Sequence, residues 1–391
     1  MLETYKSLLR VPGAFRISFS GFIARMPAGM DSLAIIFIVL GAQQKYAIAG
    51  ALTGVAALTT VVSAPFWANQ SDKRGQRFVL RIAVPARTIA MFSFIALVTF
   101  EAPIWSWFVA IMCAEATSVS VGSFTRRRWI SMLGEEKSSE VNTAYSFESA
   151  LDEIVFITGP VLATAISTIS PSAGLILATA FFLIGGSLLL THQESTPPVL
   201  QREEHPPLIW NRAVHSVAIP MLLIGGCFGP INLAIVAFSR EHGHPAIPGL
   251  LLGMGSVGGL FFALLNGAIK WKISPGIRFR INLLIFALIA LPLPYIDSIA
   301  VMFFVNFFLG GSVGPLLPTA ISIVEKHVPK SHMTEAISLI VAGIPLSGAF
   351  TSLWAGKIID SSGSSVAFWV PVLFIALGAF STLFYRRWYN A

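Results

Sequence analysis

The decapeptide Ala-Asn-Gln-Ser-Asp-Lys-Arg-Gly-Gln-Arg at residues 68–77 separates two long apolar stretches, residues 46–67 and residues 79–99. Each stretch is long enough to cross the hydrocarbon core of a bilayer as a helix, which takes about 20 apolar residues. The decapeptide between them holds an acid, several basic residues and Gly75, which suits a tight turn at a membrane surface. It is therefore predicted to be a short connection between two transmembrane helices.

Apolar stretches of this kind recur along the whole chain and predict an all-α polytopic membrane protein with 12 transmembrane helices in two six-helix halves. The expected spans are 18–40, 46–67, 79–99, 104–125, 142–168, 171–191, 214–238, 247–269, 279–298, 300–323, 333–356 and 364–385. Residues 192–213 are rich in proline and glutamate and are expected to be a cytoplasmic linker. They would separate an N-terminal bundle at 1–191 from a C-terminal bundle at 214–391, the arrangement of two repeated halves.

The composition excludes most other classes of protein. Of the 391 residues, 55% are hydrophobic and 12% are charged, and the mean hydropathy is +0.75. Soluble domains carry about 25% charged residues, so this chain has too few charges to cover a surface exposed to water. A cytosolic enzyme, a nucleic-acid-binding domain and a disordered chain are excluded on this ground. Cys113 and Cys227 lie far apart in apolar stretches and indicate neither a disulfide framework nor a metal site.

Most of the 26 basic residues fall in alternate connections between the expected spans, which sets the orientation of the chain. These connections hold Lys6, Arg10, Arg16, Lys73, Arg74, Arg77, Arg126, Arg127, Arg128, Lys137, Arg202, Arg212, Lys270, Lys272, Arg278, Arg280, Lys326, Lys330, Arg386 and Arg387. The intervening connections hold only Lys45, Arg240 and Lys357. We therefore expect a multi-pass protein of the inner (plasma) membrane with both termini in the cytoplasm. The net charge of +7 reflects this topology, although the run Arg126–Arg128 could also bind anionic lipid headgroups.

The decapeptide resembles the signature loop between helices two and three of the major facilitator superfamily, through Asp72, Lys73, Gly75 and Arg77. The resemblance implies a secondary transporter that works by alternating access around a central cavity. It also implies that this loop is a cytoplasmic gate, which latches the two halves in the outward-facing state. Two positions depart from the family pattern, since Ala68 replaces a glycine and Gln76 replaces the first residue of a basic pair.

A second resemblance lies in the fifth span, where Gly159 and Pro160 are similar to the glycine-proline motif of the antiporter branches. It implies antiport, but the alternative is helix packing and a kink, because glycine and proline are frequent in membrane helices. The fourth span lacks the arginine typical of drug–proton antiporters and has Glu115 at that position. No sugar-porter motif follows the sixth span, so neither large branch of the family is matched cleanly.

Charged residues within membrane spans are costly and usually face a water-filled cavity or each other. The candidates for proton coupling or for lining the cavity, all in the N-terminal half, are Arg25, Asp31, Arg87, Glu115, Asp152 and Glu153. Counting along the helices places Asp31 further toward the outside and the other five near the middle of the membrane. Glu148 precedes Asp152 by one helical turn and is expected at a shallower depth, near the interface. Two hypotheses stay open: the charges exchange protons during transport, or the arginines pair with the acids to fasten the bundle.

The C-terminal half contrasts with this pattern. Glu335, near the cytoplasmic start of the eleventh span, is the acid that comes closest to a span interior, and the other polar residues are amides and hydroxyls such as Asn232, Ser256 and Asn306. We infer that charge-dependent coupling belongs to the N-terminal half and that the C-terminal half supplies apolar and hydrogen-bonding surface.

The sequence therefore predicts a secondary active transporter, with proton-coupled efflux of a small apolar or amphipathic compound as the leading hypothesis. The alternatives are a proton-coupled uptake permease for a small polar metabolite and, from another class, a membrane-embedded receptor or sensor on a transporter scaffold. No nucleophile–base pair, phosphate loop or metal-ligand cluster is recognisable, so we expect no enzyme activity, no cofactor and no metal. The expected partners are a small-molecule substrate, protons and membrane lipids, without nucleic acid, and the expected state is a monomer.

Overall fold

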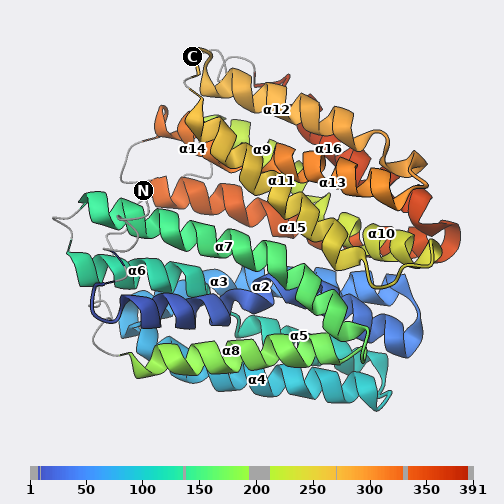
Figure 1. Cartoon of the computed structure of the whole chain (residues 1–391), viewed down its shortest axis with the longest axis horizontal. Coiled ribbons are helices and arrows are strands. Elements are labelled where there is room, and N and C mark those ends of the chain that lie inside the picture. Colours follow the sequence, from blue (N-terminus) through green and yellow to red (C-terminus); the bar gives the residue numbers. More distant parts are fainter. Residues whose placement is uncertain are drawn as a thin grey trace. The chain divides into compact units, whose positions relative to one another are not determined.

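The computed structural model describes residues 8, 10–134, 138–192, 212–269, 271–328 and 333–385, and the regular elements in these ranges are helices (Figure 1). The first part of the chain forms α2 (Ala14–Gln43), α3 (Tyr46–Arg74), α4 (Gln76–Thr99), α5 (Ile104–Ala116), α6 (Val121–Leu133), α7 (Ser138–Ser167) and α8 (Ala173–Thr191). The second part forms α9 (Arg212–Gly225), α10 (Phe228–Glu241), α11 (Pro248–Ala268), α12 (Pro275–Ala290), the 3-10 turn η2 (Leu293–Tyr295), α13 (Ile299–Val313), α14 (Leu316–Glu325), α15 (Met333–Ala367) and α16 (Trp369–Ser381).

The predicted all-α membrane fold with 12 spans is confirmed. Within the described residues, 11 helical segments are long and apolar enough to cross a membrane, and the shorter apolar helix Trp369–Ser381 is the twelfth. This last helix is shorter than the predicted span 364–385. Helix α15 is interrupted at Gly363, which has φ 81° and ψ 179°, and a short helical turn lies between this residue and α16.

Three of the spans are interrupted near their middle, because glycine, proline or a run of polar residues stops the helical hydrogen-bond ladder. The fourth span divides into α5 and α6 at Thr117–Ser120, the seventh into α9 and α10 at Gly226–Cys227, and the tenth into α13 and α14 at Gly314–Pro315. The fourth span therefore runs on to Leu133. The prediction that Arg126–Arg128 lie in a connection is wrong, because these arginines are in helix α6, where protein groups bind them.

Contacts divide the chain into two compact units. The first contains α2 and the chain from Thr59 of α3 to α8, and the second contains Gln43–Leu58 together with α9 and the helices that follow. Helix α3 is thus shared between the units. Its start is held within the second unit by Asp360 of α15, whose carboxylate oxygens accept hydrogen bonds from the backbone N–H groups of Tyr46 and Ala47, each at 2.8 Å. Most of the predicted linker at 192–213 falls outside the described residues, so the predicted domain boundary stays a prediction.

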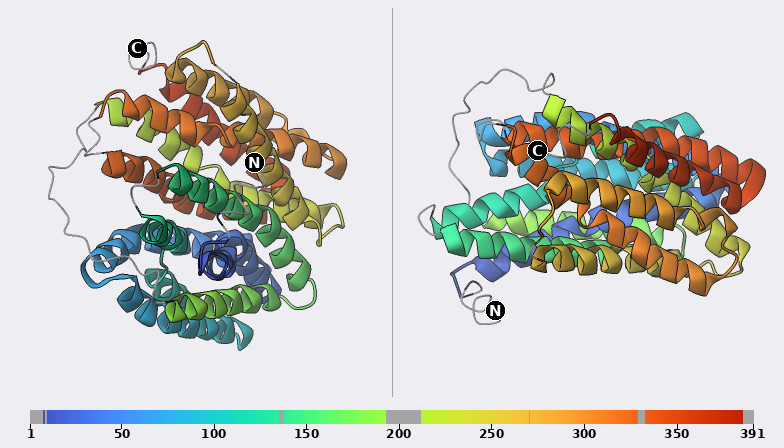
Figure 2. Two further views of the ribbon diagram at one scale, coloured as in Figure 1. Left: turned by 60° about the vertical axis from the view of Figure 1, so that its left-hand side comes forward. Right: turned by 90° about the horizontal axis from the view of Figure 1, so that it is seen from above.

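Each unit is built by neighbouring helices that pack along their length. In the first unit α4 packs against α5 and α8, and α7 packs against α6 and α8. In the second unit α15 packs against α9 and α10, α11 packs against α13, and α12 packs against α14 and α16. Figure 2 shows α2 (dark blue) nearly end-on among the other helices of the first unit, which agrees with the large buried share of this span.

The closest backbone approach between α2 and α7 lies at Gly29 and Gly159. A Cβ atom added to Gly159 would lie 2.8 Å from the Cα of Gly29, and one added to Gly29 would lie 2.4 Å from the carbonyl oxygen of Val155. Small residues of this kind let membrane helices pack closely enough for backbone contact. This contact therefore depends on the absence of side chains at both positions.

The substitution Gly159→Ala is expected to lower the melting temperature of the purified protein, because overpacking a tight contact costs about 1–3 kcal/mol. Gly267→Ala in α11 is the matched control, since a Cβ atom there meets nothing within 4 Å. Alanine is favoured over glycine in a helix by about 1 kcal/mol, so the control is expected to keep or raise the melting temperature. Thermal unfolding in detergent measures both variants, and equal melting temperatures would contradict the packing role of Gly159.

Candidate functional site

Glu148 of α7 is buried in the first unit and accepts hydrogen bonds from side chains of two other helices, α2 and α6. Its side chain is 0% exposed, and its Oε2 atom lies 2.5 Å from Nη2 of Arg25 on α2. The hydroxyl groups of Ser18 and Thr125 and the indole N–H of Trp129 also donate to its two oxygens, at 3.0, 2.9 and 2.8 Å. The depth of Glu148 in the membrane stays a prediction, and within the protein its carboxylate is enclosed by groups of α2 and α6.

Asp152 completes this group one helical turn further along α7. One of its oxygens lies 2.7 Å from Nη1 of Arg25, and the other lies 2.6 Å from Nη2 of Arg126 on α6. The remaining donor of Arg25, Nε, binds the carbonyl oxygen of Gly21 at 3.0 Å. Two arginines and two carboxylates thus offset each other, so this cluster favours the fastening hypothesis for Arg25 and Asp152.

Arg87 of α4 forms a second cluster, in which one guanidinium is shared by two acids. Its Nη2 atom lies 2.6 Å from Oδ2 of Asp31 on α2 and 3.0 Å from Oε1 of Glu115 on α5. The ring of Phe182 on α8 covers the same guanidinium, with Cζ 4.8 Å from the ring centroid. The side chains of Arg87 and Glu115 are 4% and 8% exposed, whereas that of Asp31 is 17% exposed. With both acids ionised the cluster carries one uncompensated negative charge, and Asp31 is the acid that water reaches most easily.

Helix α3 contacts this cluster through three side chains that lie on one face. The hydroxyl of Thr60 donates to Oε2 of Glu115 at 2.9 Å. The hydroxyl of Ser63 and the indole N–H of Trp67 donate to the backbone carbonyl oxygens of Glu115 and Ala116, at 3.2 and 2.7 Å. These carbonyls lie at the end of α5, where the helical i to i+4 bonds stop and Glu115 keeps a backbone bond from Ser118 at 3.1 Å. The break in the fourth span is thus satisfied by α3, as a low-dielectric environment requires.

Glu153 differs from its neighbour Asp152. It is half-buried near the middle of α7, and no other described residue forms a hydrogen bond or ion pair with it. Of the six sequence candidates, the structure brings Arg25 together with Asp152, and Arg87 together with Asp31 and Glu115. Glu153 joins neither cluster.

The predicted gating loop is shorter than expected, because helix continues through Arg74 and resumes at Gln76. Gly75 alone makes the turn, with φ 83°, a value that favours glycine. Asp72 pairs with Arg127 of α6. Gln76, which departs from the family pattern, accepts a hydrogen bond from Nε of Arg128 at 2.9 Å and donates one to the carbonyl oxygen of Phe124 at 3.2 Å.

The sequence missed several residues that complete these clusters. The three consecutive arginines of α6, which the charge pattern places in a connection between spans, are bound by Asp152, Asp72 and Gln76. Thr60, Ser63 and Trp67 were not singled out, although their spacing places them on one helical face. The motif residue Gly159 lies at the contact with Gly29, which is the packing role named as the alternative to an antiport motif.

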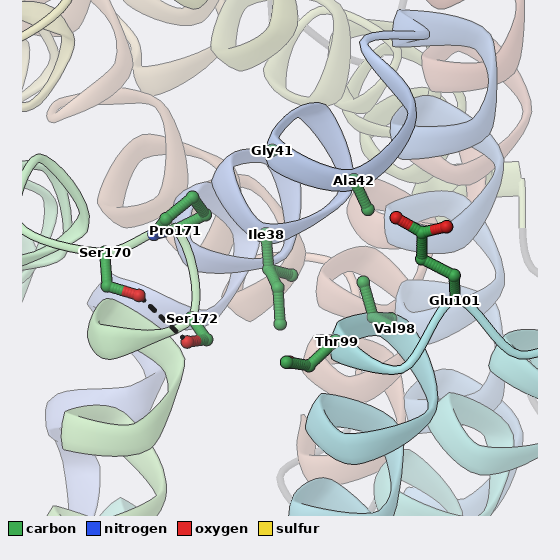
Figure 3. A pocket seen from close by; sticks show the side chains of 9 residues that line it. All are labelled: Ile38, Gly41, Ala42, Val98, Thr99, Glu101, Ser170, Pro171 and Ser172. Carbon is green, nitrogen blue, oxygen red and sulfur yellow. Dashed lines mark hydrogen bonds between the residues drawn. The ribbon is translucent and has the colours of Figure 1, made fainter.

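One pocket of the first unit lies away from these clusters, at the ends of α2 and α4 and the connection between α7 and α8 (Figure 3). It has a volume of about 200 Å³ and is lined by Ile38, Gly41, Ala42, Val98, Thr99, Glu101, Ser170, Pro171 and Ser172. Ser170 and Ser172 contact each other there, with their hydroxyl oxygens 3.2 Å apart. None of the sequence candidates lines this pocket. The described residues also contain no group of three or more histidines, cysteines or acids that could hold a metal ion.

Comparisons with known proteins agree with this architecture. The family model described as Major Facilitator Superfamily matches residues 17–313. A search of curated proteins finds no match.

Solved structures of transporters share the fold. The nucleoside transporter NupG matches with a TM-score of 0.73 at 12% identity, over 96% of this chain and 99% of its own. The xylose transporter XylE from E. coli matches with a TM-score of 0.67 at 13% identity, over 94% and 96%. A bacterial homologue of the iron transporter ferroportin matches with a TM-score of 0.63 at 16% identity, over 96% and 99%. These TM-scores establish the fold, and at such low sequence identity they say nothing about the substrate.

Substitution of Glu148 is expected to lower the stability of the protein much more than substitution of Glu153. Glu148→Gln leaves Arg25 without its closest partner in a buried site, and breaking such a pair costs about 3–5 kcal/mol. Glu153→Gln removes a charge that no described protein group offsets, so we expect a change within about 0.5 kcal/mol. Unfolding by sodium dodecyl sulfate in mixed micelles measures both variants. Equal stabilities would show that the Arg25–Glu148 pair does not hold the unit together.

Proposed function

Because the chain belongs to the major facilitator superfamily and is therefore a secondary transporter, we propose that its Arg87 cluster couples substrate efflux to proton entry. The observation that carries this proposal is one guanidinium bound by two carboxylates, those of Asp31 and Glu115. Membrane-embedded acids of this kind mark ion and proton pathways in transporters. The cargo we propose is a small apolar or amphipathic compound.

Asp31 is the acid that we assign to the proton. When both acids are ionised, one negative charge stays uncompensated in a medium of low dielectric, and protonating one acid leaves a neutral pair. Glu115 accepts hydrogen bonds from two side chains, those of Arg87 and Thr60. Asp31 is the more exposed acid and receives its described side-chain donor from Arg87 alone. A proton therefore binds the Asp31 carboxylate and leaves Arg87 paired with Glu115.

Helix α3 connects this protonation step with conformational change. Thr60 contacts Glu115 two positions after Leu58, where α3 passes from the second compact unit into the first. Protonation of Asp31 removes one of the two anions that compete for Arg87, so the remaining interaction with Glu115 strengthens. The stronger pull of Arg87 on the Glu115 carboxylate then changes the hydrogen bond that this carboxylate accepts from Thr60. A change in charge at Asp31 thereby alters a contact of α3 close to Leu58 and Thr59, where the chain passes from one unit to the other.

Export rather than uptake is favoured by the similarity of Gly159 and Pro160 to the antiporter motif. Uptake of a small polar metabolite is the second candidate, and the direction of proton-driven flux distinguishes the two. A receptor or sensor would bind ligand without any flux, so the same measurement separates that class.

The substitution Asp31→Asn is expected to abolish proton-coupled transport, because an amide cannot exchange the proton. Proteoliposomes enclosing a pH-sensitive dye and exposed to a panel of cationic, neutral and anionic aromatic compounds measure proton movement on substrate addition. At least one compound is expected to move protons with the unmodified protein and none with Asp31→Asn. The control is Glu140→Gln, the same loss of charge at the exposed first turn of α7. Full proton movement in Asp31→Asn would refute the assignment, and flux insensitive to pH would refute proton coupling.

We also propose a monomer in the inner (plasma) membrane with both termini in the cytoplasm, since the basic residues cluster on alternate connections. A fluorescent protein fused to the C-terminus is then expected to fluoresce, and alkaline phosphatase fused at the same place is expected to be inactive. The opposite pair of signals would reverse the orientation. Light scattering of the detergent-solubilised protein measures the oligomeric state.

A further inference from the structure

Helix α7 uses one face to bind its own unit. Glu148 and Asp152 on this face pair with Arg25, and Val155 and Gly159 on the same face contact Gly29 of α2. These positions recur every three or four residues, which is the spacing of one side of a helix. Other parts of α7 pack against α6 and α8, and the exposed positions that remain are available for lipid, water or ligand.

A second face of α7 is polar. Asn142, Ser146, Ser149 and Glu153 follow at spacings of four, three and four residues, which places them on a single stripe about a quarter of a turn from Asp152. The first three are exposed, and the hydroxyl of Ser146 donates to the carbonyl oxygen of Asn142 at 3.0 Å. Ile154, on a different side, is an exposed apolar residue of the kind that suits lipid. A polar stripe along a membrane helix is instead typical of a surface that faces a water-filled pathway.

Glu153 is the last residue of this stripe along the chain. It lies midway along α7, which runs from Ser138 to Ser167. The nearby cations are committed to other acids, since Arg25 binds Glu148 and Asp152 and Arg126 binds Asp152 at 2.6 Å. The negative charge of Glu153 is therefore not offset by any described protein group. A carboxylate in this setting attracts a mobile cation, because its field is weakly screened at that depth.

An aromatic ring adjoins this carboxylate. Phe156 follows Glu153 by three residues and is 46% exposed, so the two side chains are neighbours on the surface of α7. The face of an aromatic ring attracts cations and also buries apolar groups. A carboxylate beside an exposed ring matches a ligand that carries a positive charge on an apolar body.

We propose that Glu153 and Phe156 form a subsite for organic cations and that the transported compounds are amphipathic cations. This inference rests on the proposed export function and names its substrate class. It separates two roles among the first unit's acids: Asp31, which shares Arg87, carries the proton, and Glu153, which has no described partner, recognises the charge of the substrate. The charge of the cargo is then neutralised by a residue that is not needed to hold the unit together.

Binding of tetraphenylphosphonium and tetraphenylborate to the purified full-length protein in nanodiscs tests the proposal. The two ions have nearly the same size and apolar surface but opposite charge, so their difference reports recognition of charge. We expect the unmodified protein to bind the phosphonium at least about tenfold more tightly than the borate. We expect Glu153→Gln to weaken phosphonium binding about tenfold, and Glu153→Asp to restore part of it. Glu140→Gln, with the same change of charge on the same helix, is expected to bind as the unmodified protein does.

Equal binding of the two ions by the unmodified protein would overturn the proposal without any variant, so a folding defect in Glu153→Gln cannot leave it undecided. Unchanged phosphonium binding in Glu153→Gln would also overturn it. The test is independent of proton coupling: cation-selective binding that requires Glu153, without proton movement, would support the subsite and refute the coupling role of Asp31. Proton movement driven only by neutral compounds would do the reverse.

Discussion

The ion pair between Arg25 and Glu148 joins α2 and α7 at a point where both side chains are buried, and the packing of the first unit depends on it. Removing two charges from water costs several kcal/mol per ion unless hydrogen bonds satisfy the remaining atoms. Donors from α2 and α6 meet that requirement at both oxygens of Glu148. The same requirement explains why Arg126 is turned toward Asp152, since an unpaired cation at that position would be equally costly.

The acids of the first unit have different surroundings, although their chemistry is nearly the same, and we assign them different roles on that ground. Glu148 is closed off and fully bonded, which suits a structural tie. Asp31 shares its arginine with Glu115 and stays in partial contact with water, which suits the exchange of a proton. Glu153 lies on a polar stripe with no described protein partner, which suits the recognition of a charged ligand. Each role follows from the number of donors and the access of water at that position.

Helix α3 is the element that, in the proposed mechanism, connects these charges with conformational change. Its start is held by Asp360 in the second unit, and its later part supplies Thr60, Ser63 and Trp67 to the interrupted fourth span of the first. These donors add to the backbone N–H of Ser118 at Glu115 and serve the carbonyl oxygen of Ala116 at the break Thr117–Ser120. Helix α3 therefore has contacts in each compact unit, and one of them is with a carboxylate of the Arg87 cluster.

The sequence by itself determined the membrane class, the twelve spans and the candidate layer of intramembrane charges. These properties depend on the length of apolar runs and on the rarity of charge within them, both of which are local. It also identified Asp72, Gly75 and the family through a contiguous motif. The tertiary structure alone decided the pairing of the charges, since each described ion pair joins two different helices, and the pairs with α2 span 56 to 127 residues of sequence. Thus the sequence placed Glu148 near the interface, and only the approach of Arg25, Thr125 and Trp129 from α2 and α6 made it the most completely bonded acid of the unit.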